Sequence, residues 1–235
     1  MRRPISTSAA NNPSDLIHAG LRSYLQRVYM YMGMGLGFTA LVAFFIASTP
    51  SIYVPLFQSG LMWLFIFAPL GIALFFTSSI RGMRAQTAQI LFWTYTALMG
   101  VSLSSIALIY TGESIARIFL ITSCTFCGMS LYGYTTQKDL SSFSSFLFMG
   151  LLGVILASLV NLFMQSSALQ FALSVMTVLI FTGLTAYDTQ KIRDMYDASL
   201  PEETQTKMAL MGALQLYLDF LNIFLALLRL FGDRR

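Results

Sequence analysis

Two aspartates lie inside long apolar stretches in the last quarter of this 235-residue chain. Asp188 stands in the sequence Thr-Ala-Tyr-Asp-Thr-Gln, and Asp219 in Leu-Tyr-Leu-Asp-Phe-Leu-Asn. A carboxylate at membrane depth costs several kcal/mol unless it is paired, hydrated or protonated. A chain that keeps two such groups is therefore expected to use them.

The chemistry of the two aspartates depends on whether they meet. If their helices form a hairpin that turns at Pro201, Asp188 lies 13 residues before the turn and Asp219 lies 18 residues after it. The mismatch corresponds to roughly 7 Å of helix rise, which tilt or an asymmetric connection could absorb. Two carboxylates in a poorly hydrated site would share one proton. The pair would act as a pH-sensitive latch, closed when protonated and repelled or cation-seeking when ionised.

The last apolar segment carries a small and polar stripe. Its members recur at spacings of three and four residues, which places them on one helix face: Gly212, Gln215, Asp219, Asn222 and Ala226. A polar stripe must face protein or a hydrated cavity, so the last helix is predicted to be the centre of a bundle. Alternatively, Gln215 and Asn222 only link helices by hydrogen bonds. That alternative explains the two amides but not the carboxylate.

Three further side chains are candidates to assist the pair. Arg81 and Arg84 lie between the second and third apolar segments, where either guanidinium could latch the carboxylates. Both arginines are equally well explained as signals of membrane topology. Tyr187 is a candidate support beside Asp188, although helix packing would explain a tyrosine there as well.

The composition identifies the solvent of these segments as lipid. The chain is 56% hydrophobic and 10% charged, with a mean hydropathy of +0.70, whereas a soluble domain carries roughly 25% charged residues. The net charge of +4 comes from basic residues spread along the chain, which gives no indication of a nucleic-acid partner. The sequence therefore predicts a polytopic membrane protein of the all-α class.

Seven segments are long and apolar enough to span a bilayer as helices. Ten of the 14 Lys and Arg residues fall on the inner side if the N-terminus is cytoplasmic, which is the orientation we expect. Residues 1–22 are predicted to be a disordered cytoplasmic tail, and residues 23–235 a single transmembrane domain. The predicted spans are 27–48, 59–79, 86–110, 115–135, 143–164, 168–193 and 207–231.

The two aspartate motifs together resemble the Bax inhibitor-1 family, also called the transmembrane BAX inhibitor motif family. The resemblance covers about residues 21–235 and is closest to the bacterial inner-membrane branch. It implies six helices wrapped around a central C-terminal helix. It also implies a pH-dependent calcium leak gated by Asp188 and Asp219, with an arginine latch that falls on Arg81 or Arg84. Further motifs carry it at residues 130–136, 138–140 and 227–232.

Function is therefore expected to be a calcium leak of the bacterial inner membrane and not an enzymatic reaction. No cofactor is expected, and calcium would bind weakly at Asp188 and Asp219 as a permeant ion. The expected partners are the lipid bilayer, calcium and protons. An intramembrane aspartyl protease is disfavoured because no Gly-x-Gly precedes Asp219. The alternative is a non-transport protein of stress response or membrane quality control, whose polar N-terminal tail would engage a membrane protein or a protease.

Overall fold

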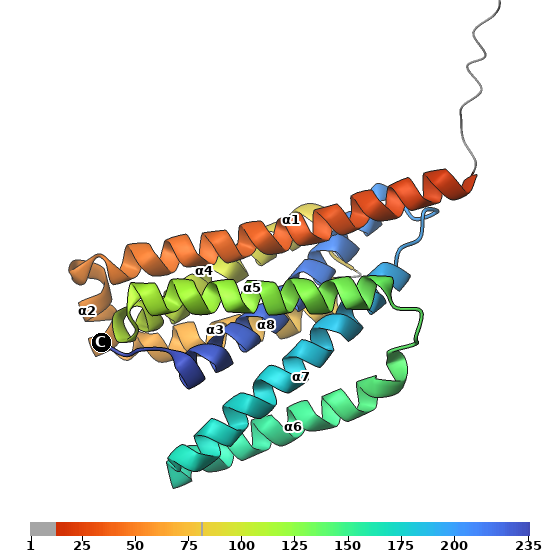
Figure 1. Ribbon diagram of the computed structural model, residues 1–235. Coiled ribbons are helices and arrows are strands. Elements are labelled where there is room, and N and C mark those ends of the chain that lie inside the picture. The colour runs from red at the N-terminus through yellow and green to blue at the C-terminus, as the bar shows by residue number, and fades with distance from the viewer. Residues whose placement is uncertain (1–12, 81) are drawn as a thin grey trace, which may run out of the picture.

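The computed structural model describes residues 13–80 and 82–235, with the side chains of 17–60, 63–80 and 82–235, and the described part is built from helices (Figure 1). Prolines mark the start of two helices, because α2 starts at Pro50 and Pro201 directly precedes α8. The helices are α1 (Pro13–Ala47), α2 (Pro50–Gln58), α3 (Leu61–Ser79), α4 (Ala85–Ile109), α5 (Gly112–Thr135), α6 (Ser141–Met164), α7 (Ser167–Asp194) and α8 (Glu202–Phe231).

Six of the described helices are long and apolar enough to cross a membrane, and the α2–α3 pair would make a seventh. The pair bends by 86° between its two helices. The all-α, polytopic architecture expected from the sequence is confirmed, and each predicted span has a matching helix. The predicted connection 49–58 is instead the short helix α2, whose first residue, Pro50, already has the backbone angle of a helix start.

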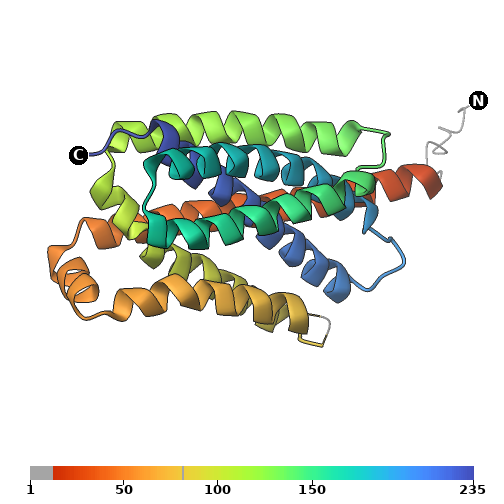
Figure 2. The same cartoon turned by 90° about the horizontal axis from the view of Figure 1, so that it is seen from below.

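Helix α8 is the centre of the bundle. Of its apolar span 72% is buried, against 28% or less for each of the other five spans. Helices α1, α4, α5 and α7 pack directly on α8, whereas α3 packs mainly on α4 and α6 on α7. Figure 2 shows α8 crossing the bundle diagonally between these helices. The expected arrangement around a central helix is confirmed, with four helices in the first layer and two outside it.

The predicted disorder of residues 1–22 is wrong from residue 13 onward, because α1 begins at Pro13. Residues 1–12 lie outside the described part. The polar composition concealed the packing of this stretch, because Leu21 packs against the hydrophobic core and Gly20 lies against the Tyr196 side chain. Arg27 on the same helix pairs with Glu202 at 3.9 Å and reaches Gln205 at 3.5 Å, both on the first turn of α8. Tertiary contacts in the stretch from Gly20 to Arg27 therefore support the N-terminal half of α1 in helical form.

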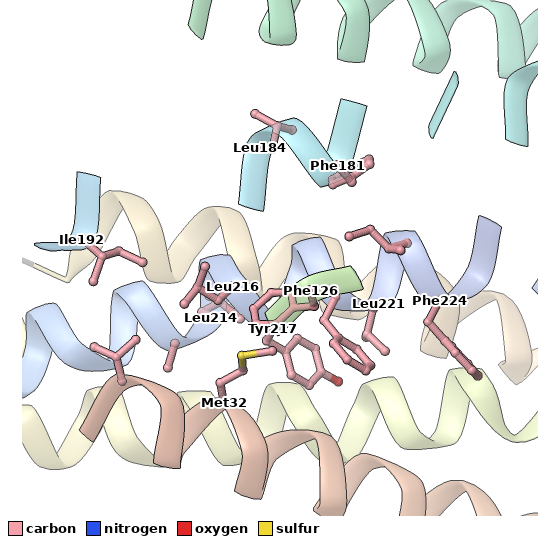
Figure 3. Packing of buried hydrophobic residues seen from close by; sticks show 14 of the residues in the cluster. Met32, Phe126, Phe181, Leu184, Ile192, Leu214, Leu216, Tyr217, Leu221 and Phe224 are labelled. Carbon is pink, nitrogen blue, oxygen red and sulfur yellow. The ribbon is translucent and has the colours of Figure 1, made fainter. Parts of the chain in front are cut away.

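The hydrophobic core is built around the apolar faces of α8. Figure 3 shows Leu216, Tyr217 and Leu221 of α8 lying between side chains of the surrounding helices. Met32 of α1 and Phe126 of α5 belong to the same cluster of buried residues. By contrast, no residue of α6 is fully buried, and many of its large apolar side chains, such as Phe146 and Phe163, face the lipid. The core thus fixes α8, and with it Asp219, in one orientation.

Candidate functional site

The two predicted aspartates meet at the α7–α8 interface. Asp188 of α7 and Asp219 of α8 are each 3% exposed, and their side chains interact directly with each other. One oxygen of each, Oδ1 of Asp188 and Oδ2 of Asp219, is buried without a hydrogen-bond partner among the described residues. A buried carboxyl oxygen without a hydrogen-bond partner raises the free energy of the folded state, so a proton or a cation bound there would stabilise it.

The connection between α7 and α8 explains how the residues meet despite unequal spacing. Asp188 lies six residues before the end of α7, and Asp219 lies 17 residues after the start of α8. The difference of 11 residues corresponds to about 16 Å of helix rise. The seven residues 195–201 can span about 23 Å when extended, which covers that offset. The hairpin is therefore asymmetric, one of the two ways in which the sequence allowed contact.

Two glycines bring the surrounding helices close to the pair. Gly212 of α8 lies against Ile192 of α7, where an added Cβ would stand 3.2 Å from three side-chain atoms. Gly133 of α5 lies against the backbone of Ala186, where an added Cβ would stand 2.2 Å from the carbonyl oxygen. Only glycine permits so close a crossing, so these contacts fix the position of α7 on both sides of Asp188.

The polar stripe of α8 faces α7 only in part. The Gln215 side chain interacts with the Asp188 carboxyl, as expected of a supporting residue. Asn222 was predicted to support the pair, but its amide donates to Leu218 O of its own helix at 2.8 Å. Tyr187 was also predicted as a support, but its ring packs edge-on against Phe148 of α6 at 6.4 Å. Adjacent residues of a helix point about 100° apart, which turns Tyr187 away from the site.

The structure does not bring Arg84 to the aspartates. Its side chain is exposed just before α4, and it forms no ion pair with either carboxyl within the described residues. Arg81 lies outside the described residues. Lys191, about one turn further along α7, is close enough to attract the Asp188 carboxylate. A latch by either arginine stays a prediction.

Sequence reasoning missed a chain of hydroxyl groups that approaches the site from α1. The Tyr29 hydroxyl bonds to Ser130 of α5, and Ser130 bonds to Thr189 of α7 at 3.2 Å. Thr189 is 1% exposed and follows Asp188 directly. The available signal was the recurrence of hydroxyl residues inside three apolar segments. The chain ties α1, α5 and α7 together at the depth of the pair.

Gln190 is a second residue that sequence reasoning did not single out. Its side chain donates to Lys138 O at 2.8 Å and accepts from Leu140 N at 2.8 Å. Both partners lie in the connection between α5 and α6, so Gln190 anchors that connection to α7. The carboxamide suits these two partners, because its NH2 group donates to a backbone carbonyl and its oxygen accepts from a backbone N–H.

The oxygen donors at the pair suit a loosely held cation. Asp188, Asp219 and Gln215 can offer carboxylate and amide oxygens, fewer than the six to eight that calcium takes. No group of three or more His, Cys, Asp or Glu side chains that could hold a metal occurs among the described residues. Water would have to complete the coordination shell, so binding would be weak and reversible.

Comparison with known proteins places the chain in a family. The family profile described as inhibitor of apoptosis-promoting Bax1 matches residues 21–235. A protein of Rickettsia prowazekii is 50% identical over 233 residues, covering 99% of this chain and 98% of the relative. A protein of Borreliella burgdorferi is 45% identical, covering 90% and 92%. Inner membrane protein YbhL of Escherichia coli is 44% identical over 220 residues, covering 92% and 94%. The chain therefore belongs to the family of inhibitors of apoptosis-promoting Bax1, the Bax inhibitor-1 family that its aspartate motifs resemble.

Proposed function

We propose that this membrane protein is a pH-sensitive calcium leak channel gated by Asp188 and Asp219. The observation that carries the proposal is the direct interaction of two carboxyl groups, each 3% exposed, between two apolar helices. Buried ionisable groups within a membrane domain mark ion and proton pathways more often than they mark structural sites. No other described carboxyl group is buried to this extent.

In this proposal, the protonation state of the two carboxyl groups decides whether the channel is closed or open. With one proton between them, the two carboxyl groups attract each other and hold α7 against α8. When both groups are ionised their negative charges repel each other, and they attract a divalent cation. Calcium would bridge the two carboxylates in passing and would be released because the protein offers too few oxygens to hold it.

The position of Gln215 is consistent with this role. Its amide can donate to an ionised carboxylate or accept from a protonated one, so it serves both states of Asp188. Lys191 favours the ionised state of the same carboxyl by its positive charge. The N-terminus is proposed to be cytoplasmic, which places the α7–α8 connection on the inner side of the bacterial inner membrane.

The test is calcium flux into proteoliposomes across pH 5 to 8. The native protein is compared with Asp188→Asn and Asp219→Asn, in which a neutral amide replaces the titrating group. We expect the pH dependence of flux to disappear in both variants. Asp194→Asn is the matched control, because Asp194 lies on the same helix but is exposed and pairs with Arg193 at 2.8 Å.

Two results would contradict the proposal. One is a native protein that passes no calcium at any pH although it is folded and inserted. The other is a flux whose pH dependence survives in both Asn variants. Either result would favour a non-transport role in membrane stress response, with the aspartates as hydrogen-bonding groups between helices.

A further inference from the structure

A cavity of about 430 Å³ opens at the end of the bundle where α4 ends and α5 begins. Its walls come from α1, α4, α5 and α8 and are mainly apolar. On α1 the successive small residues Ala40, Ala43 and Ala47 line it from the inside toward the mouth. The small side chains leave the space that larger residues would fill.

Residues 232–235, here called the tail segment, lie across the link between α4 and α5. Figure 1 shows this segment at the same end of the bundle as α2. Its backbone is held by three hydrogen bonds: Thr111 N donates to Asp233 O at 3.1 Å, Arg235 N to Ile109 O at 2.9 Å, and Asp233 N to Ser114 Oγ at 2.9 Å. These hydrogen bonds hold the tail segment in one position relative to the link between α4 and α5.

Side-chain contacts also hold the tail segment in place. Arg117 of α5 pairs with Asp233 at 2.9 Å and also donates to Phe231 O at 3.3 Å. The Arg234 guanidinium lies 5.9 Å from the centre of the Tyr110 ring. Arg235 itself lines the cavity, so a cationic residue stands at its mouth.

The inner end of the cavity comes within one turn of α8 from the aspartate pair. Phe220 lines the cavity and follows Asp219 directly. Thr39 of α1 also lines it, and its hydroxyl bonds to the Tyr217 hydroxyl at 2.7 Å. An apolar wall and one hydroxyl contact therefore separate the cavity from the site.

We propose that this cavity is the mouth of the ion path on its side of the membrane, and that the tail segment is a removable cover over it. The inference rests on the proposed function, and the path's cargo is a hydrated divalent cation. While the cover is seated, Arg234 and Arg235 repel such a cation, and the apolar wall of the closed cavity disfavours water. Release of the cover removes both barriers.

The contacts that hold the tail segment can be weakened at Arg117, which does not line the cavity, or removed together with Arg235, which does. Arg117→Gln breaks the ion pair with Asp233, and the charge swap Arg117→Asp with Asp233→Arg restores an ion pair of reversed polarity. A variant that lacks residues 233–235 removes the cover and two of its hydrogen-bond donors while leaving α8, which ends at Phe231, intact.

The experiment measures how fast a charged, membrane-impermeant methanethiosulfonate labels a cysteine at position 43 in proteoliposomes. The background carries Cys124→Ser and Cys127→Ser, because both native cysteines are exposed. Ala43→Cys reports on the cavity. Ser59→Cys is the matched control, because Ser59 is exposed in the turn between α2 and α3, at the same end of the bundle as the tail segment.

We expect labelling at position 43 to rise about two- to fivefold in Arg117→Gln, the range set by one exposed ion pair. Removal of residues 233–235 should raise it more than about tenfold, because backbone hydrogen bonds are lost as well. The charge swap should bring the rate back toward the native value, short of it because Arg117→Asp also loses the hydrogen bond to Phe231 O. The rate at position 59 should not change. Calcium flux should rise in the same order.

An unchanged rate at position 43 in the shortened variant would overturn the inference. Faster labelling without any rise in calcium flux would also overturn it, because the cavity would then lie off the ion path. Failure of the proposed function has a different signature, since a native protein without calcium flux would leave the labelling pattern as expected for a cover.

Discussion

The crossing of α5 and α7 at Gly133 offers a sharp test of how the aspartate site is positioned. In Gly133→Ala, the new Cβ would stand 2.2 Å from Ala186 O and 2.9 Å from Ala186 Cα. Carbon and oxygen atoms in contact stay more than 3 Å apart, so the two helices must separate by about 1 Å at this point. The atoms met are backbone atoms, which cannot rotate away as a side chain would. Ala186 lies two residues before Asp188, so the shift reaches the pair.

The cost of the change can be bounded from two opposing effects. Overpacking a close contact destabilises a protein by about 1–3 kcal/mol. Alanine is the better helix former by about 1 kcal/mol, which offsets part of that cost. We therefore expect Gly133→Ala to lower the free energy of unfolding by up to about 2 kcal/mol. A chain of this size loses about 2–4 °C of Tm per kcal/mol, so the expected drop is up to about 8 °C.

The assay is thermal unfolding of the purified protein in detergent micelles, followed by tryptophan fluorescence. Gly128→Ala is the matched control, because Gly128 lies on the same helix with nothing within 4 Å of an added Cβ. The control should be neutral or slightly stabilised, since alanine favours the helix and meets no neighbour. Equal Tm values for the two variants would refute the reasoning, because the close crossing would then carry no cost.

Three further predictions concern polar groups around the site. Gln190→Leu should lower the unfolding free energy by about 2–3 kcal/mol in a denaturation assay, because it leaves two backbone groups of the α5–α6 connection unpaired. Thr39→Val should cost more than Tyr217→Phe in the same assay, since Thr39 also donates to a backbone carbonyl whereas Tyr217 loses one bond. Hydrogen bonds from the side chain and backbone of Ser141 lower the pKa of Asp139 in the same connection. Its ionised form is thus favoured in the folded state, and that support is present at neutral pH and lost as pH falls through the folded pKa; an NMR titration of Ser141→Ala should show a higher pKa.

The helices themselves were predictable because their cause is local. A run of about 20 apolar residues can bury its backbone polar groups in lipid only as a helix, wherever its neighbours lie. The central position of α8 was predictable for a related reason. Asp219 and Gln215 recur on one face, and lipid excludes such a face from the periphery. Both predictions depend only on the amino-acid sequence and on the surrounding lipid.

The contacts at the site depended on geometry that the sequence does not encode locally. Spacing left the meeting of Asp188 and Asp219 open, because the path of residues 195–201 decides it. Tyr187 looked like a support because it is a sequence neighbour, but its ring packs against α6. The composition of the N-terminal region concealed the burial of Tyr24, whose ring lies 5.5 Å from that of Tyr196, in the connection between α7 and α8.

The central position of α8 has a consequence for how the protein is made. Helix α8 follows every other described helix in the chain, so it leaves the ribosome and enters the membrane after them. Until then α1, α4, α5 and α7 have no common partner to pack on, and Asp188 has neither Asp219 nor Gln215 beside it. In the half-made chain the Asp188 carboxyl therefore lacks both of its partners on α8. Completion of synthesis is therefore the step that assembles the core.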